Sequence, residues 1–384
     1  MRNSYDPIYA DNAATTQLDP AALDAMLPFL RDSYANPSSL YSFSRSAKKA
    51  LQEARETIAE CIGAKPEEII FTSGGSESDN WAIKNFVFTA PQNKRQILTS
   101  PIEHHAVLKS CDEAERLFGC STVYVSVDKF GTIDIDDYQA KLSDGVAGVS
   151  IMFANNEVGT IENIKTLAAI AHKKGIPFHT DAVQAIGHIP INVKDLGVDM
   201  LSASAHKFNG PKGIGFIYVK KGMPVVNFVN GGKQEFSLRA GTENVAAIVG
   251  MATALKNNHI QLSENISHIH KLEKEFKKVI SETAPDIIFN GDPDNHLPGL
   301  ISLSIRGCSG ESLLHLLDLK QIFVSTGAAC NSTSTEISHV LKAMQCPNEV
   351  AKGTLRISIG KYNTMDEIIR LGKILSMYIR KVSI

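Results

Sequence analysis

A lysine among small residues is the main feature of the run Ser202-Ala203-Ser204-Ala205-His206-Lys207-Phe208, which continues into Asn209-Gly210-Pro211-Lys212-Gly213. Mostly apolar residues, 198–201, precede it and a Gly/Pro turn follows, so the pattern predicts that Lys207 lies at the end of a buried strand. Partial removal from water lowers the pKa of a lysine and supplies the neutral amine that forms a Schiff base with an aldehyde. The alternative is a surface lysine beside a turn.

A carboxylate ends another short apolar segment upstream, Pro177-Phe178-His179-Thr180-Asp181-Ala182-Val183-Gln184. An amine and a carboxylate on two strand ends are the anchors that pyridoxal phosphate (PLP) requires, one for its aldehyde and one for its pyridinium nitrogen. Ser204 and His206 are short donors beside the lysine, and such a cluster can hold a phosphate. The sequence therefore predicts a PLP enzyme, with Lys207 and Asp181 as its two anchors.

Composition and charge narrow the class of protein. The chain has 384 residues with 39 basic and 41 acidic side chains, a formal net charge of -2, which argues against a general nucleic-acid or anionic-membrane surface. No apolar run approaches the roughly 20 residues of a membrane span, and the first residues do not resemble a signal peptide. We therefore expect a cytoplasmic protein without nucleic-acid or membrane partners. The six cysteines form no CxxC pair, so we expect reduced thiols and no metal site.

Strands and helices alternate along the first two thirds of the chain. This alternation predicts an α/β fold with a mainly parallel sheet, helices on both faces and chemistry at the carboxyl ends of the strands. At one such end, Ser73-Gly74-Gly75-Ser76 leads from a strand into a helix, so Gly75 and Ser76 are candidate phosphate contacts at the helix N-terminus. A plain glycine turn explains the same residues.

Two further strand ends carry polar side chains. Glu103-His104-His105 follows one strand, and an imidazole there could lie against a planar ring; a hydrogen-bonded loop histidine is the alternative. Asn155-Asn156-Glu157 follows another strand, where an amide could donate to a ring oxygen or could only shape a turn. A glycine-rich loop with Arg239 and Thr242 precedes a helix and is a further candidate anion site.

A change in composition near Asp286 predicts a smaller α+β domain at the C-terminal end. We expect a PLP-binding large domain over residues 1–258 and a small domain over 259–384, with residues 1–20 contributing to the small domain and the active site. Cys330 lies in a run of small residues, where a thiol would be exposed and able to ionise. Arg356 lies in an apolar strand, where it would bind either a substrate carboxylate or an internal acid.

The whole chain, from Tyr9-Ala10-Asp11-Asn12-Ala13-Ala14-Thr15-Thr16 to Arg356-Ile357-Ser358-Ile359-Gly360, resembles the cysteine desulfurases of the NifS/IscS type. These belong to the class V aminotransferase branch of the fold-type I PLP enzymes. The most specific matches are Asn36-Pro37-Ser38-Ser39, Phe71-Thr72-Ser73-Gly74, Glu103-His104, Asn155-Asn156-Glu157, His179-Thr180-Asp181-Ala182-Val183-Gln184, Ser204-Ala205-His206-Lys207 and Arg239-Ala240-Gly241-Thr242.

The resemblance implies a role for each matching residue. Lys207 would hold PLP covalently, Asp181 would pair with its ring nitrogen, and His104 would stack on the ring. Asn155 and Gln184 would bond the phenolic oxygen. The phosphate would be held by Gly75, Ser76, Ser204 and His206, with Thr242 reaching the phosphate in the neighbouring subunit of a homodimer. Arg356, with Asn155, would bind the substrate, and Cys330 would accept its sulfur.

The implied activity is removal of sulfur from L-cysteine, giving L-alanine and a persulfide for an iron-sulfur scaffold or another sulfur acceptor. The alternatives are a PLP-dependent aminotransferase of a small amino acid and a non-catalytic scaffold with this fold. Four residues depart from the family pattern: Tyr41, Ser44, Lys233 and Ala328. None of them replaces a proposed catalytic group.

Overall fold

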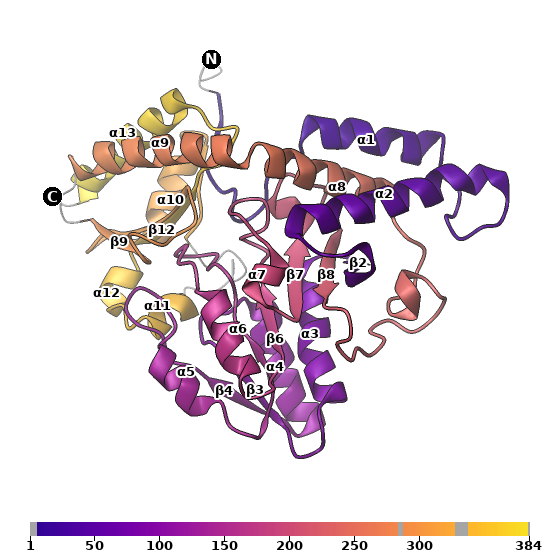
Figure 1. Ribbon diagram of the computed structural model, residues 1–384. Coiled ribbons are helices and arrows are strands. Elements are labelled where there is room, and N and C mark those ends of the chain that lie inside the picture. The colour runs from indigo at the N-terminus through magenta and orange to yellow at the C-terminus, as the bar shows by residue number, and fades with distance from the viewer. Residues whose placement is uncertain (1–5, 283–286, 327–336, 383–384) are drawn as a thin grey trace.

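The computed structural model describes residues 6–282, 287–326 and 337–382, in which a large sheet is covered by helices and a smaller sheet lies beside it (Figure 1). The large sheet has the strand order β2-β8-β7-β6-β5-β3-β4. Its strands are β2 (Ile69–Thr72), β3 (Gln96–Thr99), β4 (Ser121–Tyr124), β5 (Val146–Ser150), β6 (Phe178–Asp181), β7 (Met200–Ser204) and β8 (Gly215–Val219). Strand β8 is antiparallel to both of its neighbours, β2 and β7, and the other strand pairs of this sheet are parallel. The predicted mainly parallel α/β fold is therefore confirmed.

Both faces of the large sheet are covered by helices. Alternate side chains of each strand point to opposite faces and therefore enter different apolar cores. On β2, Ile69 and Phe71 belong to one apolar core, whereas Ile70 packs with Trp81 and Phe86 in another. The first core also takes side chains from α2 (Arg45–Ile62), α6 (Ile164–His172) and α8 (Val245–Ile260). The opposite face is covered by α3 (Gly75–Thr89), which packs against α4 (His105–Phe118).

The start of α1 (Pro20–Arg31) is set by Asp19 and Pro20. The Asp19 carboxylate accepts a hydrogen bond from Ala21 N at 3.0 Å, and Pro20 occupies the first turn, where its missing N–H is not needed.

The short helices that complete the described chain are α5 (Ile135–Lys141), α7 (Val193–Leu196), α11 (His339–Ala343) and α12 (Asn348–Ala351).

The smaller sheet is antiparallel, with the order β12-β10-β9, and it has its own apolar core. Its strands are β9 (Ile288–Asn290), β10 (Leu300–Ser304) and β12 (Thr354–Ser358), and α9 (Leu262–Ser281), α10 (Gly310–Asp318) and α13 (Met365–Val382) contribute to that core. Near the N-terminus, β1 (Ile8–Tyr9) pairs in parallel with β11 (Ile322–Phe323). The expected division between residues 258 and 259 falls in the last turn of α8, and it stays a prediction.

Within the described ranges, each helix is either too short or too polar to cross a membrane. The cysteines of these ranges are free thiols, of which Cys61, Cys111 and Cys308 are buried and Cys120 and Cys346 are partly exposed.

Candidate active site

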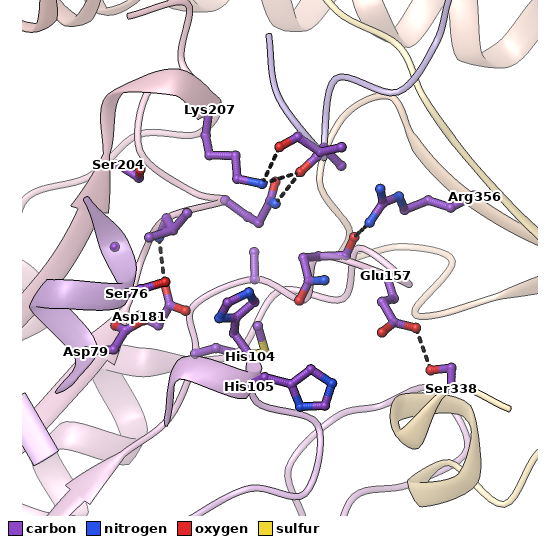
Figure 2. A pocket seen from close by; sticks show the side chains of 18 of the residues that line it. Ser76, Asp79, His104, His105, Glu157, Asp181, Ser204, Lys207, Ser338 and Arg356 are labelled. Carbon is purple, nitrogen blue, oxygen red and sulfur yellow. Dashed lines mark hydrogen bonds between the residues drawn. The ribbon is translucent and has the colours of Figure 1, made fainter. Parts of the chain in front are cut away.

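A cavity of about 560 Å³ lies at the edge of the large sheet where β6 and β7 end (Figure 2). Because these parallel strands end at the same edge, residues that are far apart in sequence meet there. Most of the residues predicted from the sequence line it: Gly75, Ser76, His104, Asp181, Gln184, Ser204, His206, Lys207 and Arg356.

Lys207 closes the 3-10 turn that directly follows β7, as its sequence context predicted. Its Nζ donates hydrogen bonds to two backbone carbonyls of the N-terminal segment, Ala13 O at 2.5 Å and Ala14 O at 2.9 Å. The Nε2 of Gln184 donates to the same Ala13 oxygen at 2.9 Å. The amine is therefore held at the cavity wall by neutral acceptors, and Figure 2 shows its bonds as dashed lines.

Asp181 ends β6 and is buried, with Oδ1 accepting a hydrogen bond from Val183 N at 2.9 Å. Burial raises the pKa of this carboxyl to about 6, and the hydrogen bond from Val183 and the charge of Lys207 oppose the rise. A second buried acid, Asp79 of α3, also lines the cavity. Burial and the nearby Asp181 both raise the pKa of Asp79, and its Oδ1 lacks a hydrogen-bond partner among the described residues.

The His104 ring projects into the cavity from the start of α4 (Figure 2). Its Nδ1 accepts a hydrogen bond from Ala106 N at 3.1 Å, so this side chain caps the helix and carries its ring proton on Nε2. Burial, assisted by the charge of Lys207, lowers the pKa of His104 to about 4. The ring is therefore a neutral imidazole at pH 7.

An opening suited to an anion lies at the start of α3. That helix has no side-chain cap, so the N–H groups of its first turn, at Gly75 and Ser76, remain available to a ligand. A Cβ placed on Gly75 would lie 2.5 Å from Val183 Cγ2 and 3.6 Å from Ser204 Cβ, so a larger residue would require Val183 or the helix start to move. His206 is close by, and its Nδ1 is 3.2 Å from Thr15 Oγ1.

Arg356 enters the cavity from β12 of the smaller sheet and is 2% exposed. The sequence left open whether it meets a substrate carboxylate or an internal acid. Its Nη2 lies 2.8 Å from Asp11 Oδ1, so the internal ion pair forms, and its Nη1 donates to Asn156 O at 3.0 Å. Its Nε is buried and has no hydrogen-bond partner within the described ranges.

Two predicted site residues, Asn155 and Thr242, are not among the described residues that line the cavity. Asn155 is buried, its Nδ2 donates to Ile102 O at 3.0 Å, and its Oδ1 accepts from Glu157 N at 2.8 Å. Thr242 is exposed and lies outside the lining. Cys330 falls in residues 327–336, outside the described ranges.

Sequence reasoning did not single out several lining residues. Asp79 was missed because it lies inside an otherwise ordinary helix, although its position three residues after Ser76 places it near the same helix end. The cavity mouth also has His105 and His339, whose ring centroids are 4.7 Å apart, and Glu157, whose Oε2 accepts a hydrogen bond from Ser338. Ser338 caps α11 by accepting a hydrogen bond from Val340 N at 3.1 Å. Of these residues, only His105 gave a signal in the sequence, because it directly follows His104.

Comparison with known sequences identifies one family over nearly the whole chain: residues 8–371 match the family described as aminotransferase class-V. A cysteine desulfurase IscS of Dictyoglomus turgidum is 46% identical over 375 residues, which cover 98% of this chain and 95% of the relative. A cysteine desulfurase IscS of Methanosarcina thermophila is 43% identical over 375 residues, covering 98% of this chain and 92% of that protein.

Solved structures are similar over the same extent. A NifS-like protein superposes with a TM-score of 0.92 at 37% identity, covering 98% of this chain and all (100%) of that chain. The structure of SspA in complex with cysteine has a TM-score of 0.82 at 34% identity, covering 93% of this chain and 100% of the other.

Proposed function

Because this chain belongs to the class-V aminotransferase family, whose members depend on PLP, we propose that it is a cysteine desulfurase. It removes sulfur from L-cysteine, releases L-alanine and retains the sulfur as a persulfide for transfer to an acceptor. The observation that carries the proposal is the meeting of Lys207, Asp181 and Arg356 in one cavity, in a chain similar to cysteine desulfurases over nearly its full length.

The lining residues fit PLP. The N–H groups of Gly75 and Ser76 at the uncapped start of α3 suit a phosphate. The raised pKa of Asp181 suits a group that meets a protonated ring nitrogen, because an opposite charge restores the carboxylate. When bound, PLP supplies an aldehyde for covalent attachment and a ring that stabilises negative charge at the Cα of an attached amino acid.

The lining residues that the sequence analysis predicted then each have a task. The phosphate contacts are Gly75, Ser76, Ser204 and His206. Asp181 would pair with the ring nitrogen, Gln184 would bond the phenolic oxygen, and neutral His104 would stack on the ring. Lys207 would hold the cofactor covalently, and its amine would take the Cα proton of the substrate. The assignment of Asn155 to the phenolic oxygen and the substrate stays a prediction, since its side chain bonds Ile102 and Glu157 in this structure.

Arg356 binds the carboxylate of cysteine, and the Cys330 thiolate accepts the sulfur. In that step a bond forms between the Cys330 sulfur and the substrate sulfur, and the bond from the substrate sulfur to Cβ breaks. The electron pair of the broken bond stays on the carbon side and takes up a proton, so that alanine results. No external oxidant is needed, because the two-electron oxidation of the thiol sulfur to sulfane sulfur is balanced by the reduction of the substrate Cβ to the methyl group of alanine.

A homodimer is part of the proposal, because the exposed Thr242 is then available to the cofactor phosphate of a second subunit. We further propose a cytoplasmic enzyme that passes its persulfide sulfur to an iron-sulfur scaffold or another sulfur-acceptor protein.

The experiment measures alanine and sulfide from the purified holoenzyme with L-cysteine as the sole substrate and a thiol reductant present. We expect equal amounts of both products. The Cys330→Ala variant should retain the yellow cofactor and lose sulfide release, whereas the matched control Cys346→Ala, at a partly exposed thiol, should retain both. Native rates in Cys330→Ala would exclude the proposed role of that thiol. Turnover that requires a keto acid and yields no alanine from cysteine would instead indicate an aminotransferase.

A further inference from the structure

One short segment, residues 11–16, contacts both Arg356 and Lys207. Asp11 at its start forms the ion pair with Arg356, and the carbonyls of Ala13 and Ala14 accept the bonds from Lys207 Nζ. The two residues that are assigned to the substrate carboxylate and to the cofactor are therefore joined through four residues of backbone. This arrangement gives Asp11 a place in the site that the sequence motif alone did not indicate.

The contacts of Arg356 fix the plane of its guanidinium. Its side chain is 3% exposed, so rotation into solvent cannot satisfy its donors. Nη2 is held by Asp11 and Nη1 by the Asn156 carbonyl, whereas Nε has no partner among the described residues. A planar group held at two of its nitrogens presents its remaining N–H groups in a set direction, as bidentate binding of a carboxylate requires.

Asp11 is itself held rigidly. Its carbonyl oxygen accepts from Ala14 N at 3.0 Å and from the Tyr9 hydroxyl at 3.1 Å. Two residues further on, Ala13 N donates to Ser358 Oγ at 2.8 Å, which ties the segment to β12, the strand that carries Arg356. The backbone of Asp11 is thus fixed relative to β12, and the 2.8 Å contact of its Oδ1 with Nη2 places the carboxylate beside the guanidinium.

We propose that Asp11 is a positioning residue that orients Arg356 to receive the carboxylate of the amino-acid substrate. This inference rests on the proposed function, in which Arg356 binds that carboxylate. Asp11 neutralises the buried guanidinium and holds it in place, while the Nη protons that bind neither Asp11 nor Asn156 are available to the ligand. The opposite role, in which Asp11 competes with the substrate for Arg356, has the opposite consequence, because removing a competitor would tighten carboxylate binding.

The test compares two amines that differ only in a carboxylate, L-alanine and ethylamine. Both are titrated into the holoenzyme while the absorbance of the bound cofactor is followed. In Asp11→Ala we expect alanine to bind about tenfold more weakly and ethylamine to bind within about twofold of wild type, because one charged hydrogen bond is lost. The KM for cysteine should rise by about the same factor with little change in kcat.

Asp11→Asn keeps an acceptor oxygen for Nη2 without the charge, so we expect an intermediate loss of alanine affinity. If Asp11→Ala does not bind the cofactor, the alanine and ethylamine titrations of Asp11→Asn test the proposal instead. In the Arg356→Ala background, Asp11→Ala should cause no further loss, since the two residues act as one unit. The proposal is overturned if a variant that loads cofactor like wild type binds alanine as tightly as wild type or more tightly. Failure of the proposed function has a different signature, which is wild-type enzyme that releases no alanine from cysteine.

Discussion

Asp181 and Lys207 interact electrostatically at the cavity: burial raises the pKa of the Asp181 carboxyl to about 6, and the charge of Lys207 opposes that rise. The carboxylate is therefore held in a site where it lacks a full counter-charge. A protonated pyridine nitrogen supplies one, which makes Asp181 the residue on which cofactor affinity should depend most among the acids of the cavity.

We expect Asp181→Asn to weaken PLP binding by at least about tenfold, because a charge-assisted hydrogen bond is replaced by a neutral one. Equilibrium titration with PLP, followed by absorbance, measures this change. The matched control is Asp199→Asn, which alters a partly buried acid that bonds His172 at 2.7 Å and lies outside the cavity lining. Equal PLP affinity in the Asp181 variant and the control would refute the assigned role.

Gly75→Ala should weaken the binding of PLP more than the binding of pyridoxal, which has no phosphate. The added Cβ would lie 2.5 Å from Val183 Cγ2, so either the helix start or the valine must move. We expect the variant to lose affinity for PLP by about tenfold or more and to lose little affinity for pyridoxal. Trimming the obstructing side chain in the double variant Gly75→Ala/Val183→Ala should restore much of the PLP affinity. If the double variant binds no better, steric crowding is not the cause.

Glu103 gives the protein a pH-dependent stability. It is fully buried, and burial raises its pKa to about 8, although Ser100 Oγ and Met152 N both donate to its Oε1. The unfolded value is about 4.3, so between these two pH values the native state binds more protons at this group than the unfolded state does. Its contribution to stability is therefore complete below about pH 4 and is lost as the pH rises toward 8.

Glu103→Gln removes that titration. We expect the free energy of unfolding of the variant, relative to wild type, to rise between pH 5 and 8 by up to about 1.4 kcal/mol per pH unit and to level off above that range. Denaturant unfolding at a series of pH values measures the difference. The exposed Glu53→Gln serves as the control and should give a flat difference. A flat difference for Glu103→Gln as well would mean that this carboxyl titrates normally.

Much of the site was predictable because parallel strands end together. Lys207 and Asp181 each follow a short apolar run in the sequence, and adjacent parallel strands bring such ends to one edge. The Gly-Gly-Ser turn likewise predicted the open start of α3. These features are local, so the sequence carries them directly.

Other parts of the site and of the fold depend on contacts between distant residues and left no local signal in the sequence. The pairing of Arg356 with Asp11 joins positions 345 residues apart, and the sequence could only offer an internal acid as one of two alternatives. The orientation of Asn155 is set by the turn that its own Oδ1 stabilises, so a polar residue at a strand end need not face the cavity. The short helices α5 and α7 were not predicted, because four to seven residues are too few to show a helical period.

A buried ion pair supports the loop that carries Arg239 and Thr242. The Arg55 guanidinium contacts both oxygens of Glu235, at 2.6 and 2.8 Å, and Phe71 N donates to the same carboxylate at 2.8 Å. Glu235, Phe236 and Ser237 all have positive φ angles of 44°, 57° and 64°, which are unfavourable for residues with a Cβ. The ion pair therefore stabilises a strained turn.

Removing one partner should be costly because it leaves the other charge buried and unpaired. We expect Glu235→Ala to lower the free energy of unfolding by about 3–5 kcal/mol, measured by urea denaturation. The exposed pair Lys49–Glu53 provides the contrast, since Glu53→Ala should cost less than about 1 kcal/mol. The double variant Arg55→Leu/Glu235→Leu should recover part of the loss, because no charge is left without a partner. A loss for Glu235→Ala no larger than that for Glu53→Ala would show that the strained turn holds without the ion pair.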